Sequence, residues 1–134
     1  MRVRKPFEET EKKVARVCFI FRNSDGVVLT EVCDEKGRRP LPHVPIHSPT
    51  GFEMGYQGSG PADLALAVLC EALRVPPENR TEAFFRKDIS KATHVAWDCH
   101  QRYKRSFVAK WHTWATVDLD EVEKWAAAQE GKLR

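Results

Sequence analysis

The stretch His47-Ser-Pro-Thr-Gly-Phe-Glu-Met-Gly-Tyr-Gln-Gly-Ser-Gly-Pro-Ala-Asp-Leu-Ala-Leu-Ala-Val-Leu69 decides the fold of this chain. Its first half, residues 47–60, is rich in glycine and proline, a composition typical of an irregular loop. From Pro61 to about Leu73 the residues are almost all apolar, and proline suits the first turn of a helix because its missing N–H has no partner there. A helix that is apolar nearly all round is buried on most sides, so we expect it to be the central helix of the fold.

The junction between this loop and the helix has two explanations. Gly58-Ser59-Gly60 precedes a helix, where a phosphate can meet free backbone N–H groups. However, no Lys-Ser/Thr pair follows as in a P-loop, Pro61 removes one donor, and the Asp63 carboxylate would repel an anion. We therefore predict a structural turn in which Gly60 caps the helix and Asp63 lies in its first turn.

A β-hairpin is expected before this stretch. Residues 14–21 and 27–33 are rich in β-branched and aromatic side chains, and they flank a turn sequence at 23–26. Pairing of Arg22 with Val27 would place one face of each strand against the central helix. That face would consist of Val17, Phe19, Phe21, Val28, Thr30 and Val32.

The remaining elements complete an α+β fold. Residues 34–40 predict a turn, and the prolines of 41–46 predict an extended segment. After the central helix we expect a short helix at 81–89, a longer helix at 91–111, a strand at 111–117 and a last helix. The fold class is then a small antiparallel sheet, made of the N-terminal hairpin and a C-terminal strand, packed on a buried central helix with two or three further helices.

Two patterns support the C-terminal half of this prediction. The longer helix has a core stripe at the spacing of successive turns, formed by Ala96, Cys99, Tyr103 and Phe107. The last helix opens with a capping box from Asp118 to Glu121, and its Val122 and Trp125 would face inward.

Length and composition predict one domain, residues 1–134, with the charged residues 1–13 as a flexible lead-in. No apolar run approaches the ~18 residues of a membrane span, and the N-terminus lacks the apolar segment of a signal peptide. The four cysteines form no C-x-x-C pair, so we expect neither a disulfide framework nor a zinc site. These features predict a cytoplasmic protein without a metal or cofactor.

Positive charge gathers in residues 80–112, which hold eight Lys/Arg and three Asp/Glu, although the whole chain has a net charge of only +3. The ordinary explanation is a solvated helix face beside core tryptophans. The functional alternative is a contact face for an acidic protein or for single-stranded nucleic acid, because tryptophans are interleaved with the basic residues. That face would comprise Arg86, Lys87, Lys91, Arg102, Lys104, Arg105 and Lys110.

The histidines carry no catalytic or metal-binding signature. The sequence contains no H-E-x-x-H, no ligand pair at helical spacing and no Ser-His-Asp signature, so ordinary loop or surface histidines are favoured. His47 lies beside the glycine-rich run and is the histidine that a small-ligand or enzyme site would use. Such a site would comprise His47, Tyr56, Gly58, Ser59, Gly60 and Asp63.

The residues from His47 to Leu66 resemble the signature H-S-P-x-G-F-x-x-G-Y-x-G-S-G-P-A-x-L-A-L of small, mostly uncharacterised proteins that are common in bacteriophages, plasmids and their hosts. With similar C-terminal features at Tyr103–Val108, Trp114 and Trp125, the resemblance covers about residues 14–127.

The chain departs from that family at Met54, where members often have Trp, and it lacks the aromatic-Gly start that many members have. The resemblance carries no catalytic residues. It implies a phage or mobile-element accessory protein, and such proteins usually bind a host or defence macromolecule. The leading hypothesis is a non-enzymatic protein that binds and modulates such a macromolecule, in transcription or in nuclease-based defence of the CRISPR type. We expect the basic segment 86–110 to be the contact face. Nucleic-acid binding by that segment, or a ligand or enzyme site along His47–Gly60, are the alternatives.

Overall fold

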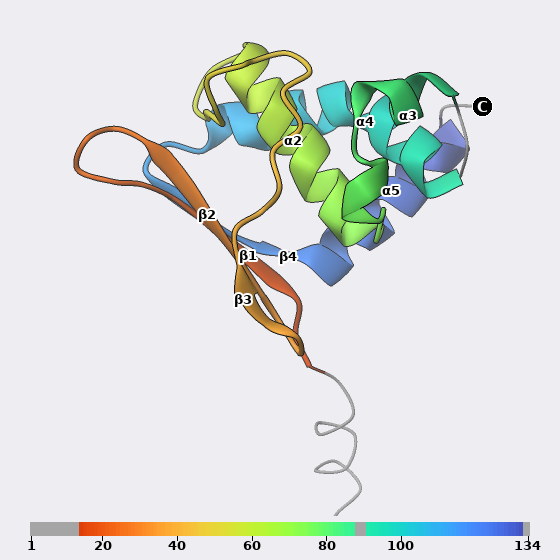
Figure 1. The fold of residues 1–134 in the computed structure, drawn as a ribbon, viewed down its shortest axis with the longest axis horizontal. Coiled ribbons are helices and arrows are strands. Elements are labelled where there is room, and N and C mark those ends of the chain that lie inside the picture. The colour runs from red at the N-terminus through yellow and green to blue at the C-terminus, as the bar shows by residue number, and fades with distance from the viewer. Residues whose placement is uncertain (1–13, 88–90, 133–134) are drawn as a thin grey trace, which may run out of the picture.

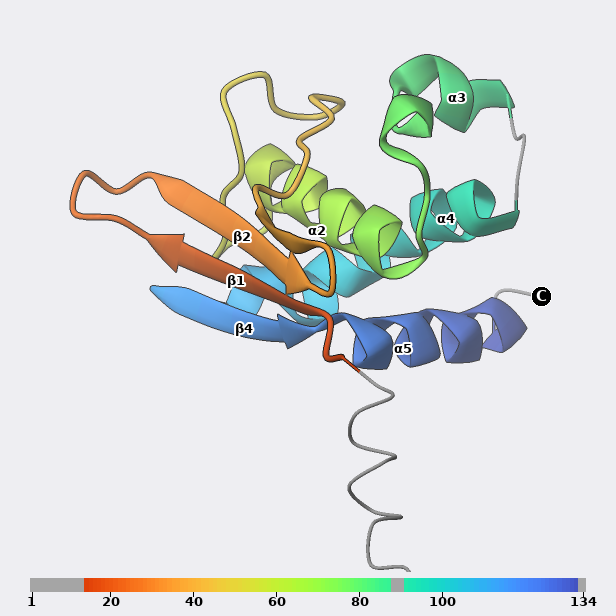
Figure 2. The ribbon, with the colours of Figure 1, turned by 60° about the horizontal axis from the view of Figure 1, so that its bottom comes forward.

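The computed structural model of the chain describes residues 14–87 and 91–132. The expected lead-in, residues 1–13, lies outside the described residues, and so do the side chains of Phe84, Arg86 and Lys87. The helices that the structure describes all lie on one face of a twisted sheet (Figures 1 and 2). The α+β fold class is confirmed.

One antiparallel sheet contains the four strands β1 (Val17–Arg22), β2 (Val28–Asp34), β3 (Gly37–Arg39) and β4 (Trp114–Asp118). Their spatial order is β3-β2-β1-β4, so β3 and β4 form the two edges. The expected hairpin is β1–β2, and the expected C-terminal strand is β4, which begins at residue 114 rather than 111. β3 is not predicted, because a three-residue strand of glycine and arginine has no strand signal of its own.

The central helix is α2 (Ser59–Ala72), and every residue from Gly60 to Ala72 is buried, as its apolar sequence predicts. It contacts two long helices and shares one core with the inner face of the sheet. The other helices within residues 14–87 and 91–132 are η1 (Pro77–Asn79), α3 (Glu82–Lys87), α4 (Lys91–Ser106), η2 (Val108–Lys110) and α5 (Leu119–Lys132), where η1 and η2 are short 3₁₀ helices.

The hairpin register differs from the predicted one by one residue. Asn23 and Val27 close the turn through a backbone hydrogen bond of 2.9 Å, and Gly26 adopts a φ of +83° between them. Such a three-residue loop with glycine at its last position is a common hairpin connection. Arg22 therefore pairs with Val28 rather than with Val27.

This shift reverses the predicted faces of β1. Because side chains alternate along a strand, Cys18 and Ile20 enter the core, whereas Phe19 and Phe21 lie on the opposite face. The prediction that Val17, Phe19 and Phe21 pack on the central helix is wrong. On β2, Val28 and Val32 are buried as predicted.

α4 ends at Ser106 rather than at residue 111, and η2 follows it. Three members of the predicted core stripe, Ala96, Cys99 and Tyr103, are buried. Phe107 is 36% exposed, because the helix ends before it.

α5 begins at the predicted capping box. The Asp118 carboxylate accepts hydrogen bonds from the backbone N–H groups of Asp120 at 3.0 Å and Glu121 at 3.3 Å. Val122 is buried and Trp125 packs against the core.

Candidate functional site

Asp63 anchors the glycine-rich loop and does not cap α2. Its buried carboxylate accepts hydrogen bonds from the backbone N–H groups of His47 at 2.9 Å and Ser48 at 3.0 Å, and it lies 2.9 Å from His43 Nε2. The predicted helix start is wrong in both respects, because Gly58 rather than Gly60 is the cap residue and the first turn of α2, which begins at Ser59, has no acidic residue. The carboxylate therefore fastens the start of the loop to the central helix.

The loop's own side chains account for its glycines. A Cβ added to Gly58 would lie 2.5 Å from the Tyr56 ring, and one added to Gly60 would lie 2.6 Å from Cβ of Glu53. Real Cβ atoms do not approach neighbours so closely, so Gly60 needs glycine for packing alone, whereas a side chain at Gly58 would require the exposed Tyr56 ring to move aside. This packing favours the structural turn over a phosphate cradle.

His47, from the loop, and His100, from α4, contact each other through their imidazoles. The two Nε2 atoms are 3.0 Å apart, and His100 Nδ1 is 2.6 Å from the Trp97 carbonyl oxygen. A carbonyl only accepts, so Nδ1 of His100 carries a hydrogen, and Nε2 of the neutral ring accepts the hydrogen of His47 Nε2. His100 is buried, although it is not a member of the core stripe predicted from the sequence.

The surroundings favour the neutral form of His100. Burial lowers the pKa of His100, and the neighbouring His47 lowers it further, although the hydrogen bond to the Trp97 carbonyl acts in the opposite direction. His100 is therefore the neutral acceptor in this contact between the loop and α4.

A pocket of about 450 Å³ lies beside this pair, lined by Ile46, His47, Glu82, Phe85 and Trp97. Its aromatic rings pack on one another, with centroids 5.5 Å apart for Phe85 and Trp97. Of the predicted ligand-loop residues only His47 lines it. Within residues 14–87 and 91–132, no group of three or more His, Cys, Asp or Glu is placed to hold a metal ion.

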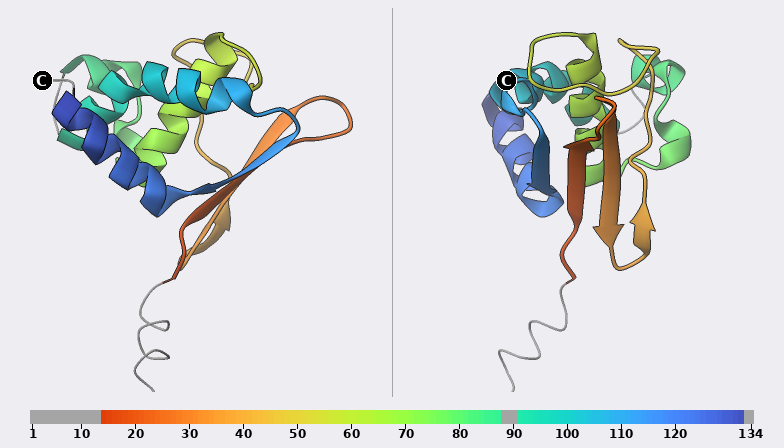
Figure 3. Two further views of the ribbon diagram at one scale, coloured as in Figure 1. Left: turned by 180° about the vertical axis from the view of Figure 1, so that it is seen from behind. Right: turned by 90° about the vertical axis from the view of Figure 1, so that its left-hand side faces the viewer.

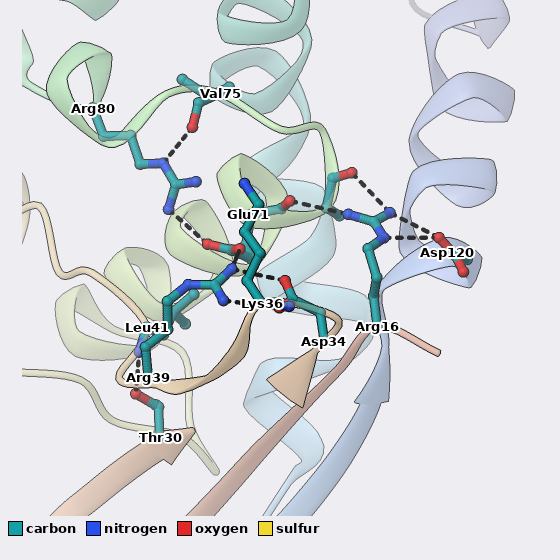
Figure 4. A network of polar contacts seen from close by, with 11 residues as sticks. Arg16, Thr30, Asp34, Lys36, Arg39, Leu41, Glu71, Val75, Arg80 and Asp120 are labelled. Atoms are coloured by element: carbon teal, nitrogen blue, oxygen red, sulfur yellow. Dashed lines mark hydrogen bonds and ion pairs between the residues drawn. The ribbon is translucent and has the colours of Figure 1, made fainter. Parts of the chain in front are cut away.

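A polar cluster lies at the C-terminal end of α2 (Figure 4). The buried Glu71 carboxylate pairs with Arg39 at 2.6 Å and with Arg80 at 3.0 Å, and Arg39 also pairs with Asp34 at 3.0 Å. The hydrogen bond from Arg39 lowers the pKa of Asp34. The carboxylates and guanidinium groups therefore neutralise one another in pairs.

Arg16 extends this cluster to α5. It donates to the backbone carbonyls of Glu71 and Ala72 at the end of α2, and it pairs with Asp120 at 2.9 Å. A guanidinium suits the negative end of a helix. The adjoining cavity of about 1050 Å³ is lined by residues of both charge signs, so we interpret the cluster as a structural tie between β1, α2 and α5.

The buried cysteines are unsuited to nucleophilic chemistry. Burial raises the pKa of Cys18 and of Cys70 to about 12, and it raises the pKa of Cys99 as well. Such thiols stay protonated at neutral pH, whereas the thiolate is the reactive species.

Two members of the predicted basic face bond with side chains of α5. Arg102 donates to Gln129 Oε1 at 2.8 Å, and Lys91 pairs with Glu130 at 3.2 Å. These contacts join α4 to α5.

The remaining basic candidates on α4 and η2 differ in exposure. Arg105 and Lys110 are exposed, whereas Lys104 is half-buried. The side chains of Arg86 and Lys87 lie outside the described residues. Fewer basic side chains are therefore available to a partner, among the described residues, than the number of Lys and Arg in this segment indicates.

One face of the sheet is turned away from the helices and is here called the open face (Figures 1 and 3). This face is partly apolar. Its outward side chains are those of Val17, Phe19, Phe21, Leu29, Glu31, Cys33, Arg38, Trp114, Thr116 and Asp118. Trp114 is 68% exposed, Phe21 and Leu29 are each 41% exposed, and Phe19 is 40% exposed. Phe21 pairs with both Leu29 and Trp114, so these three side chains form one row across β2, β1 and β4.

Sequence reasoning misses the open face, although β1 carries a signal for it. The run Val17-Cys-Phe-Ile-Phe21 is apolar at every position, so both faces of this strand are apolar. In an antiparallel sheet covered on one side, the alternation is normally apolar inside and polar outside. An uninterrupted apolar run therefore indicates a second apolar surface.

The comparisons with known proteins supply a family without a function. A family model described as a family of unknown function, DUF6166, matches residues 21–128. No curated protein and no solved structure matches the chain. None of the helices in the described ranges is long and apolar enough to cross a membrane.

Proposed function

The chain belongs to the DUF6166 family, whose function is unknown, and from its own surface we propose that it is a protein-binding module whose contact surface is the open face. The observation that carries this proposal is the row Trp114–Phe21–Leu29, in which three large apolar side chains are 41–68% exposed on neighbouring strands. Tryptophan and other aromatic residues dominate the energy of protein interfaces, and contiguous exposed apolar patches mark such interfaces.

The charges of the open face favour a protein partner over a nucleic acid. The acids Glu31 and Asp118 lie on this face together with one base, Arg38, and Glu31 is 3.7 Å from Arg38. Nucleic-acid binding depends on clustered Lys and Arg, which neutralise phosphates. An apolar row flanked by two acids and one base is suited to a partner that presents its own apolar surface, and it offers no excess of positive charge for phosphates.

The resemblance of residues 47–66 to proteins of phages and plasmids supports a more specific role. The partner would be a host protein, such as a component of transcription or of nuclease-based defence, and the chain would be an accessory protein that modulates it. Such a role requires only binding through the apolar row, so it needs no catalytic residue.

A second candidate is nucleic-acid binding, which is supported by the exposed side chains of Arg105 and Lys110. It predicts that material captured by the chain disappears after nuclease treatment and is held less well at high salt.

The first test is affinity capture from host lysate with the wild-type chain and with Trp114→Ser. We expect a protein that withstands nuclease treatment, is retained by the wild type and is lost with Trp114→Ser. The matched control is Tyr56→Ser, which removes another exposed aromatic side chain (51% exposed) outside the sheet. Retention of the same protein by Trp114→Ser, or absence of any protein specific to the wild type, would overturn the proposal.

A further inference from the structure

The two edges of the sheet differ in how they are protected. β3 has three residues, including two arginines, and Pro40, which has no N–H, follows it directly. Short length, charge and proline are the usual devices that prevent an edge from pairing with another chain. β4 has five residues, Trp-Ala-Thr-Val-Asp, with none of these devices except the acidic residue at its end.

The register identifies the backbone groups that β4 directs away from the sheet. Arg22 N–H donates to the Thr113 carbonyl, and Leu119 N–H donates to the Arg16 carbonyl. Hydrogen-bonded positions alternate in an antiparallel pair. The backbone N–H and C=O groups of residues 113, 115, 117 and 119 therefore point toward β1, and those of residues 114, 116 and 118 point away from the sheet edge. Within the described part of the chain, the outward N–H and C=O of Trp114 and Thr116 have no hydrogen-bond partner.

We propose that the partner contributes an extended segment that adds to β4 as a fifth strand, an inference that rests on the proposed function. The outward backbone groups of Trp114 and Thr116 would bond to this strand, as in β-augmentation. Its side chains beside Trp114 would continue the apolar row, and its side chain beside the exposed Asp118 would be basic. The segment is therefore recognised by alternate apolar residues with a Lys or Arg at the end that lies beside Asp118.

A second copy of the chain fits this edge less well. Antiparallel pairing of β4 with itself about Thr116 would place the Trp114 ring of each copy opposite the Asp118 carboxylate of the other. In that pairing the ring would have no apolar neighbour across the strands, and the carboxylate would have no basic one. This mismatch favours a strand of another protein as the occupant.

The discriminating variant is Thr116→Pro. Proline removes the outward N–H of residue 116 and leaves the hydrogen bonds to β1 in place, and edge strands tolerate proline at such positions. Thr116→Val is the matched control, because it keeps the N–H and loses only the hydroxyl. Equal melting temperatures of the two variants establish that the sheet is intact.

We expect Thr116→Pro to weaken binding of the captured protein by about tenfold or more, and Thr116→Val to stay within about threefold of the wild type. In the wild-type complex, hydrogen exchange of the Trp114 and Thr116 amides should slow. Equal binding by both Thr116 variants, with Trp114→Ser still defective, overturns strand addition but leaves the open face as the contact surface. A dimer of the purified chain that only Thr116→Pro dissociates overturns the choice of occupant.

Discussion

Asp63 and Asp118 each lie near the start of a helix, yet they hold different groups. Asp118 accepts hydrogen bonds from the first turn of α5 and is exposed. Asp63 is buried and binds the N–H groups of His47 and Ser48 with different carboxylate oxygens. A local pattern of residue types predicts a cap equally well in both places, but only the packed structure shows which donors reach each carboxylate.

Replacement by asparagine distinguishes these two roles. Asp63→Asn replaces one accepting carboxylate oxygen by an NH₂ donor, which would face a backbone N–H donor. We therefore expect the free energy of unfolding to fall by about 2–4 kcal/mol. Asp118→Asn should change it by less than about 0.5 kcal/mol, because asparagine caps helices as well as aspartate does. Urea unfolding of both variants measures the difference. A near-neutral Asp63→Asn would contradict the anchoring role.

Burial of His100 predicts a dependence of stability on pH. The pKa of His100 is lower in the folded chain than its ordinary value of 6.5, so below that value the unfolded chain binds a proton that the folded chain does not. The free energy of unfolding should therefore fall as the pH drops below 6.5 toward the folded pKa, with a slope of at most about 1.4 kcal/mol per pH unit for one proton.

His100→Gln removes this component and is the comparison to make. Its free energy of unfolding, measured in urea between about pH 5 and 7.5, should depend less on pH than that of the wild type. Parallel pH profiles for the two proteins would show that His100 does not contribute.

Among the elements, β1 decides which surface is available for binding. Its apolar character, its partner β2 and the position of the turn are all readable from the sequence. The turn closes at Asn23–Val27 rather than at Arg22–Val27. This difference of one residue exchanges the buried and exposed faces of β1, so the predicted faces are wrong. Because both faces of β1 are apolar, burial of apolar side chains does not favour one hairpin register over the other. The geometry of the turn therefore decides the register.

Neighbouring residues of β1 test this assignment. Ile20→Ala should lower the free energy of unfolding by about 2–4 kcal/mol, because Ile20 is 1% exposed, whereas Phe21→Ala should cost less than about 1 kcal/mol. Chemical denaturation at constant pH compares the two variants. The reverse order would restore the register predicted from the sequence.

At the scale of the whole molecule, the central helix is the part that the sequence predicts best. Thirteen consecutive buried residues of α2 follow from an apolar run that no exposed helix could carry. The polar cluster at its C-terminal end could not be predicted, because Arg16, Arg39 and Arg80 come from three distant segments that meet only in the fold (Figure 4). The open face likewise depends on all the described helices lying on one side of the sheet (Figure 2).

The proposed function rests on the row Trp114–Phe21–Leu29 as the binding surface of the molecule. The most direct measurement is the dissociation constant of the purified captured protein for the wild type, Trp114→Ser and Tyr56→Ser, with melting temperatures as a check of folding. We predict that Trp114→Ser weakens binding by at least about 30-fold, roughly 2 kcal/mol, and that Tyr56→Ser stays within about twofold of the wild type. Unchanged binding by a folded Trp114→Ser, or an equal loss in both variants, would contradict the claim.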